Sequence, residues 1–338
     1  MKATVYEGNK SFKVIEKEIE QPQKGEVRIK VAYVGVCGTD VHIYHGMMDK
    51  RVKMPETIGH EMSGVIDAVG EGVSEYAVGD KVVVRPLDDR LVKPSDKGFN
   101  HICEELKFVG IDSEGAMQQY WNVPDFILHK LKAETDLKLA ALIEPLSVAT
   151  HDVRRSGLVK GETAVVLGGG PIGLLVAMVA KEVGAQVIVS EVNPKRVAKA
   201  KELGFDAVNP MDVDLVEYVK GKTENRRADV VFEVAGVQPT LDIMCEVAGI
   251  RGRILMVAIH GEKKPVDLFK FFWKELSLIG ARVYEKEDYE KSIQLITANE
   301  LPFEQMITDV QPLTKIQQVF ENIDNNPDGM KVLMDCQL

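Results

Sequence analysis

Hydrophobic and polar positions follow different patterns in the two halves of the chain. In the first half, residues 27–31 alternate between apolar and charged side chains, and residues 82–84 form a compact valine run. Glycines punctuate these stretches closely, as is typical of short strands joined by tight turns. The pattern therefore predicts a β-rich first domain. A polar, proline-containing loop is expected at residues 86–99.

After about residue 150, apolar strands alternate with helices. We expect strands at 163–167, 187–190, 228–232, 253–257 and 276–280, and helices at 172–182, 194–203 and 239–246. This alternation indicates βαβ units and a parallel sheet. The last part carries two predicted helices, 289–296 and 313–323, and a strand at 330–334. It is too short for a core of its own, so we expect it to pack on the first domain.

Length and composition fit a two-domain α/β protein. The 338 residues suggest two domains at roughly 100–200 residues each. Lys and Arg number 42 against 52 Asp and Glu, a net charge of −10, which excludes the basic footprint of a nucleic-acid or anionic-membrane partner. No apolar stretch approaches the ~20 residues of a membrane span. The first ten residues lack the apolar core of a signal peptide, so the cytoplasm is the expected location. Four scattered cysteines do not form a disulfide framework.

A glycine fingerprint, G-x-G-x-x-G, follows the predicted strand at 163–167 and opens a predicted helix. Its residues are Gly168, Gly170, Pro171, Ile172 and Gly173. The glycines allow a sharp turn, close approach of a pyrophosphate and close helix–strand packing. Glu191 stands eighteen residues past Gly173, where a carboxylate accepts the adenosine ribose hydroxyls and repels a 2′-phosphate. NAD is therefore the expected cofactor. Arg196 either lines the adenine side of this pocket or is a solvated helix charge.

Candidate metal ligands stand apart from one another in the first half. They are Cys37, the adjacent pair His60 and Glu61, and Glu144 inside an apolar stretch. Thiolate, imidazole and carboxylate together suit zinc. Taken singly, however, a free cysteine is most often buried packing, and an adjacent His-Glu pair is common in surface turns. Because no close CxxC-type spacing links these positions, spacing alone leaves the metal site undecided.

The motifs taken together resemble those of the medium-chain zinc-dependent alcohol dehydrogenase superfamily. They are Cys37-Gly38-Thr39-Asp40-Val41-His42, Gly59-His60-Glu61, Glu144-Pro145 and the glycine fingerprint, in this order. Within the superfamily, the polyol (sorbitol-type) and L-threonine dehydrogenases are most similar. The resemblance spans essentially the whole chain. It implies a GroES-like catalytic domain at 1–150, to which 285–338 returns, and a Rossmann domain with a doubly wound parallel sheet at 151–284.

The resemblance also implies roles for single residues. Cys37, His60 and Glu61 would hold one catalytic zinc, with Glu144 as a fourth ligand or in exchange with water or substrate. A bend at Gly59 is then required, because adjacent side chains on a straight strand point to opposite faces. The second, structural zinc of many members needs four cysteines, whereas residues 86–100 contain none and Cys103 stands alone. We therefore expect no structural zinc.

The implied reaction is hydride transfer from a secondary alcohol to NAD. Thr39 and His42 would relay the hydroxyl proton, Asp40 or Glu144 would orient a ligand, and Arg282 would either hold substrate or form a surface or interdomain charge. Polyols, sugar alcohols and sugar acids are the expected substrates, and the relatives suggest a homotetramer or another homo-oligomer. L-Threonine is the alternative substrate, although the missing structural-zinc cysteines weigh against it. A non-catalytic NAD(H)-binding sensor is the alternative from a different class.

Overall fold

The computed structural model describes residues 1–326 and 328–338 and divides into two compact units. Unit 1 consists of Met1–Glu144 and Tyr289–Leu338, and unit 2 of Pro145–Asp288. The sequence pattern puts the boundaries at 150/151 and 284/285. The division falls within helix α3 (Ile143–Ser156). Each unit is described by itself below.

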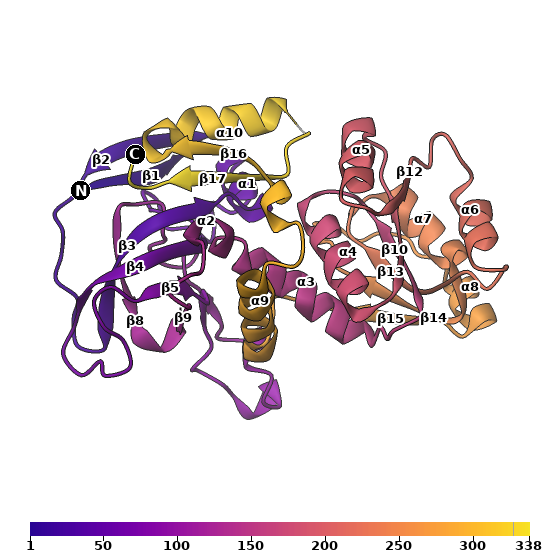
Figure 1. Cartoon of the computed structure of the whole chain (residues 1–338), viewed down its shortest axis with the longest axis horizontal. Coiled ribbons are helices and arrows are strands. Elements are labelled where there is room, and N and C mark those ends of the chain that lie inside the picture. Colours follow the sequence, from indigo (N-terminus) through magenta and orange to yellow (C-terminus); the bar gives the residue numbers. More distant parts are fainter. Residues whose placement is uncertain (327) are drawn as a thin grey trace. The chain divides into compact units, whose positions relative to one another are not determined.

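Unit 1 is built mainly of short strands (Figure 1). Its strands are β1 (Lys2–Gly8), β2 (Ser11–Glu16), β3 (Glu26–Gly35), β4 (Glu61–Val69), β5 (Lys81–Val84), β6 (Leu87–Asp88), β7 (Lys107–Phe108), β8 (Tyr120–Pro124), β9 (Leu128–Lys130), β16 (Ile307–Pro312) and β17 (Lys331–Asp335). Its helices are α1 (Gly38–Tyr44), α2 (Leu137–Ala140), α9 (Lys286–Ala298), which begins in unit 2, and α10 (Ile316–Asn325). Short 3₁₀ turns lie at Pro94–Asp96, Asn100–Ile102, Asp125–Ile127, Phe303–Met306 and Leu313–Lys315.

The main sheet of unit 1 combines strands β3–β5, β8 and β9 with the C-terminal strands β16 and β17. Its strand order is β16-β17-β3-β4-β5-β9, and β8 also pairs with β3. In β3 the alternating residues Val27, Ile29 and Val31 are fully buried, as the apolar–polar alternation predicts. The C-terminal strand β17 runs antiparallel to β3, with Leu333 opposite Gly35. The C-terminal strand is therefore part of the main sheet of unit 1.

The loop predicted at 86–99 is mostly irregular but carries two short elements, β6 and the 3₁₀ turn at Pro94–Asp96. The Asp96 carboxylate accepts the backbone N–H groups of Lys93, at 2.6 Å, and of Glu104, at 3.1 Å. Arg90 lies over the Phe126 ring, 3.9 Å from its centroid. Hydrogen bonds, ion pairs and a cation–π contact thus hold this segment.

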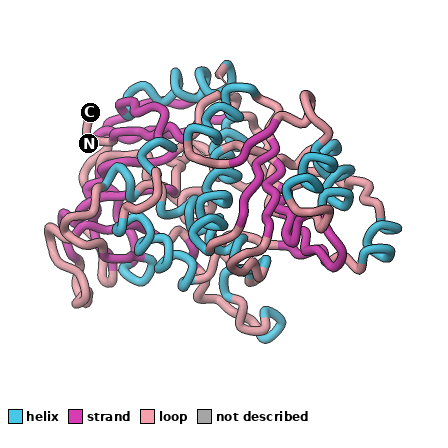
Figure 2. The backbone as a smooth tube through the Cα atoms, turned by 45° about the vertical axis from the view of Figure 1, so that its right-hand side comes forward, coloured by secondary structure: helices cyan, strands magenta, loops and turns pink. Residues whose placement is uncertain are grey.

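Unit 2 alternates strands and helices. Its strands are β10 (Thr163–Leu167), β11 (Gln186–Ser190), β12 (Asp206–Val208), β13 (Ala228–Glu233), β14 (Ala248–Met256) and β15 (Ser277–Gly280). Its other helices are α4 (Pro171–Val183), α5 (Pro194–Glu202), α6 (Leu215–Lys222), α7 (Gln238–Val247) and α8 (Leu268–Lys274). The strands form one parallel sheet in the order β12-β11-β10-β13-β14-β15 (Figure 2).

Helices cover both faces of this sheet. Val165 and Leu167 of β10 pack in one cluster with residues of α6 and α7, such as Val219 and Met244. The alternate β10 residue Val166 points to the other face, toward the start of α4 at Gly173. Because β10 is buried on both faces, its sequence is a continuous apolar run rather than an alternating one. The strand order reverses between β10 and β13, which is the doubly wound arrangement of a dinucleotide-binding fold.

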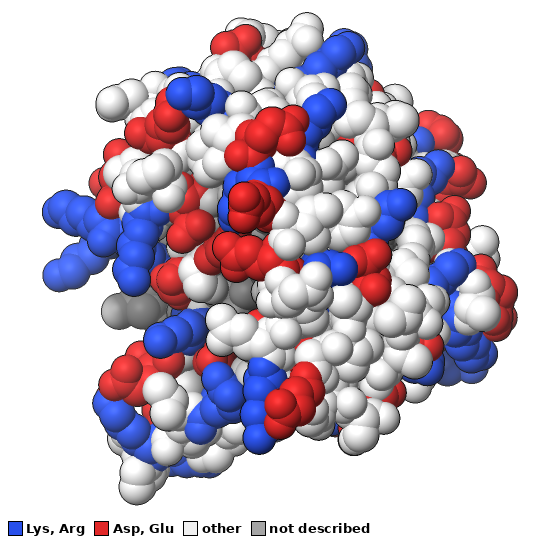
Figure 3. All heavy atoms as spheres, turned by 90° about the vertical axis from the view of Figure 1, so that its left-hand side faces the viewer, with Lys and Arg blue, Asp and Glu red and all other residues white. Residues whose placement is uncertain are grey.

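On the face drawn in Figure 3, acidic and basic side chains are interspersed rather than gathered in a basic stripe. Over the described ranges 1–326 and 328–338, every helix is too short or too polar to cross a bilayer.

Candidate active site

Cys37 is held at the start of helix α1 by a reciprocal cap. Its Sγ accepts the backbone N–H of Thr39 at 3.5 Å, and its own N–H is donated to the Asp40 carboxylate at 2.8 Å. The helix therefore begins at Gly38, with the backbone N–H of Thr39 directed at the sulfur. Cysteine binds metals as the thiolate.

His60 and Glu61 approach Cys37 because the backbone bends before strand β4. Gly59 has a φ of 102°, a conformation in which a side chain is strained, and a Cβ there would lie 2.8 Å from Met117 Cγ. The strand begins only at Glu61, so His60 precedes the regular alternation. The adjacent side chains can therefore share one site.

The ligand atoms of Cys37, His60 and Glu61 all lie within 4.8 Å of one another. His60 and Glu61 are buried, and Cys37 is half-buried. Of the buried atoms in this group, His60 Nδ1 lacks a hydrogen-bond partner among the described residues, whereas Glu61 Oε2 forms an ion pair with Lys331 at 2.5 Å. A thiolate, an imidazole and a carboxylate converging in a buried place fit zinc, which takes sulfur, nitrogen and oxygen ligands.

Asp40 lies beside the His60 ring. Its carboxylate is fully buried, and Oδ1 lies 3.6 Å from His60 Nδ1, an electrostatic contact slightly too long for a hydrogen bond. Burial alone lowers the pKa of His60, but Asp40 and the Cys37 thiol outweigh it and raise the pKa to about 10. Burial raises the pKa of Asp40, and the nearby His60 opposes this shift. The pocket thus favours positive charge between Asp40 and Cys37.

Lys331 is part of the same site, and the sequence analysis did not identify it. Its side chain is buried, and Nζ lies 2.6 Å from Glu61 Oε1 and 2.5 Å from Glu61 Oε2. It also donates to the backbone carbonyl of Val36 at 3.1 Å. Burial lowers the pKa of Lys331, but Glu61 and Cys37 more than compensate and raise it. The one available signal was its place in a predicted strand, two residues from the buried Leu333 and therefore on the same face.

Gly35 gives the Glu61 carboxylate its room. The register places Gly35 of β3 between Glu61 of β4 and Leu333 of β17. A Cβ on Gly35 would lie 2.3 Å from Glu61 Oε2, so any larger residue would displace this carboxylate. The absence of a side chain at this position is therefore a condition for the site.

The remaining residues predicted for this site lie at different distances from the cluster. Glu144 is buried, and its charge raises the pKa of both His60 and Lys331, but it is not among the residues whose ligand atoms meet within 4.8 Å. Thr39 lies half-buried in the first turn of α1, and His42 is exposed one turn later. A role for Glu144 as fourth ligand stays a prediction.

The glycine fingerprint forms a tight turn between β10 and α4. Gly168 has a φ of 115°, and a Cβ on Gly173 would lie 1.9 Å from the Gly168 carbonyl oxygen. Helix α4 begins at Pro171, with Gly170 as a cap that offers no side-chain hydrogen bond. Its first N–H groups are therefore left for an anionic ligand, as a pyrophosphate site requires.

Glu191 follows β11 and fastens the glycine turn. Its Oε2 accepts the N–H of Gly169 at 2.8 Å, and its Oε1 accepts the N–H of Asn193 at 2.8 Å. A carboxylate has about four acceptor positions, so it can still accept ribose hydroxyls. Arg196 lies in the first turn of α5, with its Nη1 3.5 Å from the position of a Cβ on Gly170. Glu191 and Arg196 thus flank the turn from the side of β11.

Arg282 is exposed in the segment that follows β15, and Tyr284, two residues later, is fully buried.

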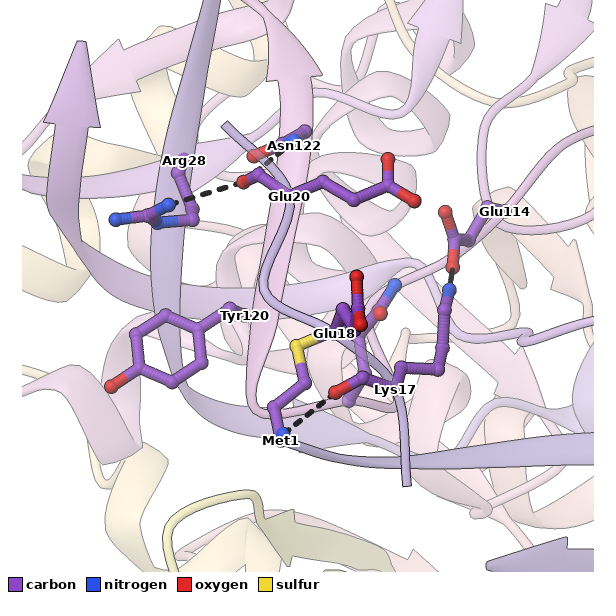
Figure 4. A pocket seen from close by; sticks show the side chains of 9 residues that line it. Met1, Lys17, Glu18, Glu20, Arg28, Glu114, Tyr120 and Asn122 are labelled. Atoms are coloured by element: carbon purple, nitrogen blue, oxygen red, sulfur yellow. Dashed lines mark hydrogen bonds and ion pairs between the residues drawn. The ribbon is translucent and has the colours of Figure 1, made fainter. Parts of the chain in front are cut away.

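A polar hollow of about 40 Å³ lies in unit 1 (Figure 4). Its lining residues are Met1, Lys17, Glu18, Glu20, Arg28, Glu114, Gln118, Tyr120 and Asn122. Several of them bind each other, as when the Met1 ammonium donates to the Lys17 carbonyl at 2.8 Å. None of the residues predicted to act on substrate or cofactor lines this hollow.

Comparisons with known proteins agree with this geometry. Residues 23–133 match the alcohol dehydrogenase GroES-like domain, and residues 171–298 match the zinc-binding dehydrogenase family. The chain is 57% identical to the 2-dehydro-3-deoxy-L-galactonate 5-dehydrogenase of Pseudoalteromonas atlantica, over 99% of each chain. It is 33% identical to the sorbitol dehydrogenase of Halalkalibacterium halodurans, again over 99% of each.

A solved structure from Escherichia coli CFT073, named a short chain alcohol dehydrogenase and complexed with NADH, superposes with a TM-score of 0.91. It is 30% identical, and the match covers 99% of both chains. The chain belongs to the medium-chain, zinc-dependent alcohol dehydrogenase superfamily. It is thus an oxidoreductase with a GroES-like domain and a Rossmann domain, and the predicted fold class is confirmed.

Proposed function

We propose that the protein is a zinc- and NAD-dependent dehydrogenase that oxidises a secondary alcohol of a sugar acid or polyol. The observation that carries this proposal is the buried convergence of Cys37, His60 and Glu61 in a chain that also has the dinucleotide turn. The alcohol loses a hydride to the nicotinamide and a proton to the protein, and it becomes a ketone while NAD is reduced.

Each residue of the site has a defined task in this reaction. Cys37, His60 and Glu61 would hold one zinc ion, and Asp40 orients His60. When bound, zinc acts as a Lewis acid that lowers the pKa of an alcohol or water ligand. Thr39 accepts the substrate proton and His42, exposed one turn further along α1, passes it to solvent. Glu144 serves as a fourth ligand or exchanges with substrate, and Cys103 alone supports no structural zinc.

The cofactor preference is assigned to Glu191. Its buried carboxylate would accept the adenosine ribose hydroxyls, and a 2′-phosphate there would meet a negative charge. The NADH in the E. coli relative supports a nicotinamide dinucleotide, and the preference for NAD rests on Glu191. Arg196 is the proposed neighbour of the adenine or phosphates.

The substrate proposal follows the relative with 57% identity. We assign the C5 hydroxyl of 2-dehydro-3-deoxy-L-galactonate as the group oxidised, with sorbitol-like polyols as the second candidate. The guanidinium of Arg282 is the proposed partner of the substrate carboxylate. L-Threonine, the alternative from the sequence, has less support because both named relatives act on sugar derivatives by name.

The protein is proposed to act in the cytoplasm as a homo-oligomer, with a tetramer as the expected form. Strand β15 is an edge of its sheet, and the neighbouring helix α8 exposes Leu268, Phe269, Phe272 and Trp273, each by at least 62%. A second copy would cover such an apolar helix and pair with the free strand edge. Light scattering on a Trp273→Glu variant tests this. A variant with the same mass as the parent protein would contradict this interface.

A panel assay tests the proposed function. NADH absorbance is followed with 2-dehydro-3-deoxy-L-galactonate, sorbitol, simple alcohols and L-threonine, each with NAD and with NADP. We expect the sugar acid with NAD to be preferred, and Cys37→Ala to lose zinc and turnover together. Tight NAD binding without turnover of any alcohol would support the sensor alternative. Full activity of a zinc-free Cys37→Ala protein would reject the zinc mechanism.

A further inference from the structure

The turns that follow β13 and β14 pack against the glycine turn at the carboxyl edge of the sheet of unit 2. A Cβ on Gly168 would lie 3.1 Å from the backbone nitrogen of Ala235. A Cβ on Gly236 would lie 3.1 Å from the Cβ of Ala258. Three neighbouring turns, after β10, β13 and β14, are therefore in contact, and their side chains share one edge.

A buried acid and a histidine face each other at this edge. Glu233, the last residue of β13, is fully buried, and its Oε1 accepts the Gly236 N–H at 2.8 Å and the Thr240 hydroxyl at 2.6 Å. Its Oε2 lies 3.4 Å from Nε2 of His260, whose side chain is 17% exposed. Oε2 and both ring nitrogens of His260 lack a hydrogen-bond partner within the part of the chain that the structure describes.

Such orphaned atoms are costly to the fold. A buried polar atom without a partner costs about 1–3 kcal/mol, so native proteins rarely keep one without a functional reason. The Gly236 N–H already satisfies Oε1 of Glu233, so this oxygen has a structural role in the turn. The structure gives no such role to Oε2. A ligand with a hydrogen-bonding group near His260 would give the unpartnered atoms of His260 and Glu233 a function.

The strand order indicates which part of the dinucleotide reaches this edge. Glu191, assigned to the adenosine ribose, follows β11 on one side of β10, whereas β13 and β14 lie on the other side. A dinucleotide crosses the sheet edge where the strand order reverses, with its phosphates on the turn after β10. The nicotinamide half then extends over the ends of β13 and β14, where Glu233 and His260 stand.

We propose that His260, positioned by Glu233, binds the nicotinamide-riboside half of NAD. The histidine ring accepts a hydrogen bond from the carboxamide or from a ribose hydroxyl of the cofactor. This inference rests on the proposed cofactor. A carboxylate beside Nε2 favours the tautomer that carries its proton there, which leaves Nδ1 as an acceptor. The carboxamide N–H and the ribose O–H are donors that fit this acceptor. The charge of Glu233 disfavours a phosphate at the same place, so we assign the riboside rather than the pyrophosphate.

Calorimetric titration of the full chain with NAD, ADP-ribose and AMP tests the proposal. His260→Ala is expected to weaken NAD binding about tenfold, which corresponds to ~1.4 kcal/mol, and to leave AMP binding unchanged. A loss that extends to ADP-ribose assigns the contact to the ribose, and a loss confined to NAD assigns it to the carboxamide. His45→Ala, whose ring pairs with Asp324 in unit 1, is the matched control and should bind all three ligands as the parent does.

Glu233→Gln provides the test of positioning. Glutamine keeps an oxygen for the Gly236 N–H but removes the charge that fixes the histidine tautomer. NAD binding should weaken as in His260→Ala, and the double variant should lose little more, because the two residues act as one unit. Unchanged NAD affinity in His260→Ala, or an equal loss of AMP affinity, would overturn the inference. A parent protein that binds none of the three ligands would instead refute the proposed cofactor itself.

Discussion

The ammonium group of Lys331 contacts both carboxylate oxygens of Glu61, at 2.6 and 2.5 Å, inside the part of unit 1 that holds Cys37 and His60. Removing one member of a buried ion pair is costly, because the remaining charge loses its partner and stays shielded from water. The pair therefore neutralises Glu61 when no metal is bound. A bound metal ion would give the carboxylate a second positive partner.

Replacing Lys331 by methionine should destabilise the metal-free protein by about 3–5 kcal/mol, since it leaves the Glu61 charge buried and unpaired. Zinc should recover part of this loss, because it binds the folded state through the freed carboxylate. Urea unfolding with and without zinc measures both effects. Lys331→Arg is the control that keeps the charge. An equal loss with and without zinc would show that Glu61 is not a ligand.

Replacing Gly35 by alanine should lower zinc affinity at least tenfold, because the new Cβ would lie 2.3 Å from Glu61 Oε2. Metal content after dialysis against a chelator is the measurement. Gly38→Ala is the matched control, since nothing lies within 4 Å of a Cβ at Gly38. Zinc retention that is the same in both variants would mean that Glu61 need not hold its present position.

Replacing Glu191 should change the cofactor preference in two separable ways. Glu191→Ala should weaken NAD by about 10–100-fold, since the ribose loses hydrogen bonds to a charged acceptor. Glu191→Gln keeps an acceptor oxygen but not the charge, so it should mainly raise affinity for NADP. Titrations with both cofactors report the ratio. An unchanged ratio in the glutamine variant would remove Glu191 from the ribose site.

Asp288 gives unit 2 a pH-dependent contribution to stability. Burial raises its pKa, but hydrogen bonds from His151 and Arg154, at 2.8 and 2.7 Å, outweigh this and lower the pKa to about 2. An unfolded aspartate titrates near ~3.9, so the contribution is present above about pH 4 and is lost as pH falls toward 2.

Asp288→Asn should therefore cost ~1–2 kcal/mol at pH 7, after allowance for screening, and much less at pH 2. Urea unfolding curves of parent and variant across this range measure the difference. A gap between the two proteins that is constant from pH 7 to pH 2 would show that the charge of Asp288 is not what stabilises the unit.

Much of unit 2 could be predicted from the sequence because its pattern is local. The apolar run at 163–167 and the glycines that follow it specify a buried strand, a tight turn and a helix within about twenty residues. The structure has β10 and α4 there. Helix α8 (LFKFFWK), by contrast, exposes four large apolar side chains, and hydrophobic periodicity alone gave no reason to expect this. They are Leu268, Phe269, Phe272 and Trp273.

The residues proposed to bind a metal could be named from the sequence, but their surroundings could not. Cys37, His60 and Glu61 carry ligand chemistry that is visible in the residue types, whereas Lys331 and Gly35 act through strand register. Register depends on which strands pair, and β17 pairs with β3 across nearly the whole length of the chain. No local signal specifies such a pairing. The cap of helix α1 by Cys37 and Asp40 is local, but the sequence analysis did not predict it.

The position of β17 near the C-terminus of this sequence also affects the order in which the pocket forms during synthesis. Glu61 and Lys331 are separated by 270 positions, and all of unit 2 is translated between them. Once the first 150 residues have left the ribosome, Cys37, His60 and Glu61 have all been synthesised. Lys331, the partner of the Glu61 carboxylate, has not. Domains fold in the order in which they emerge, so the nucleotide-binding unit can mature before the catalytic one is complete. Completion of the proposed catalytic pocket thus waits for strand β17 to leave the ribosome.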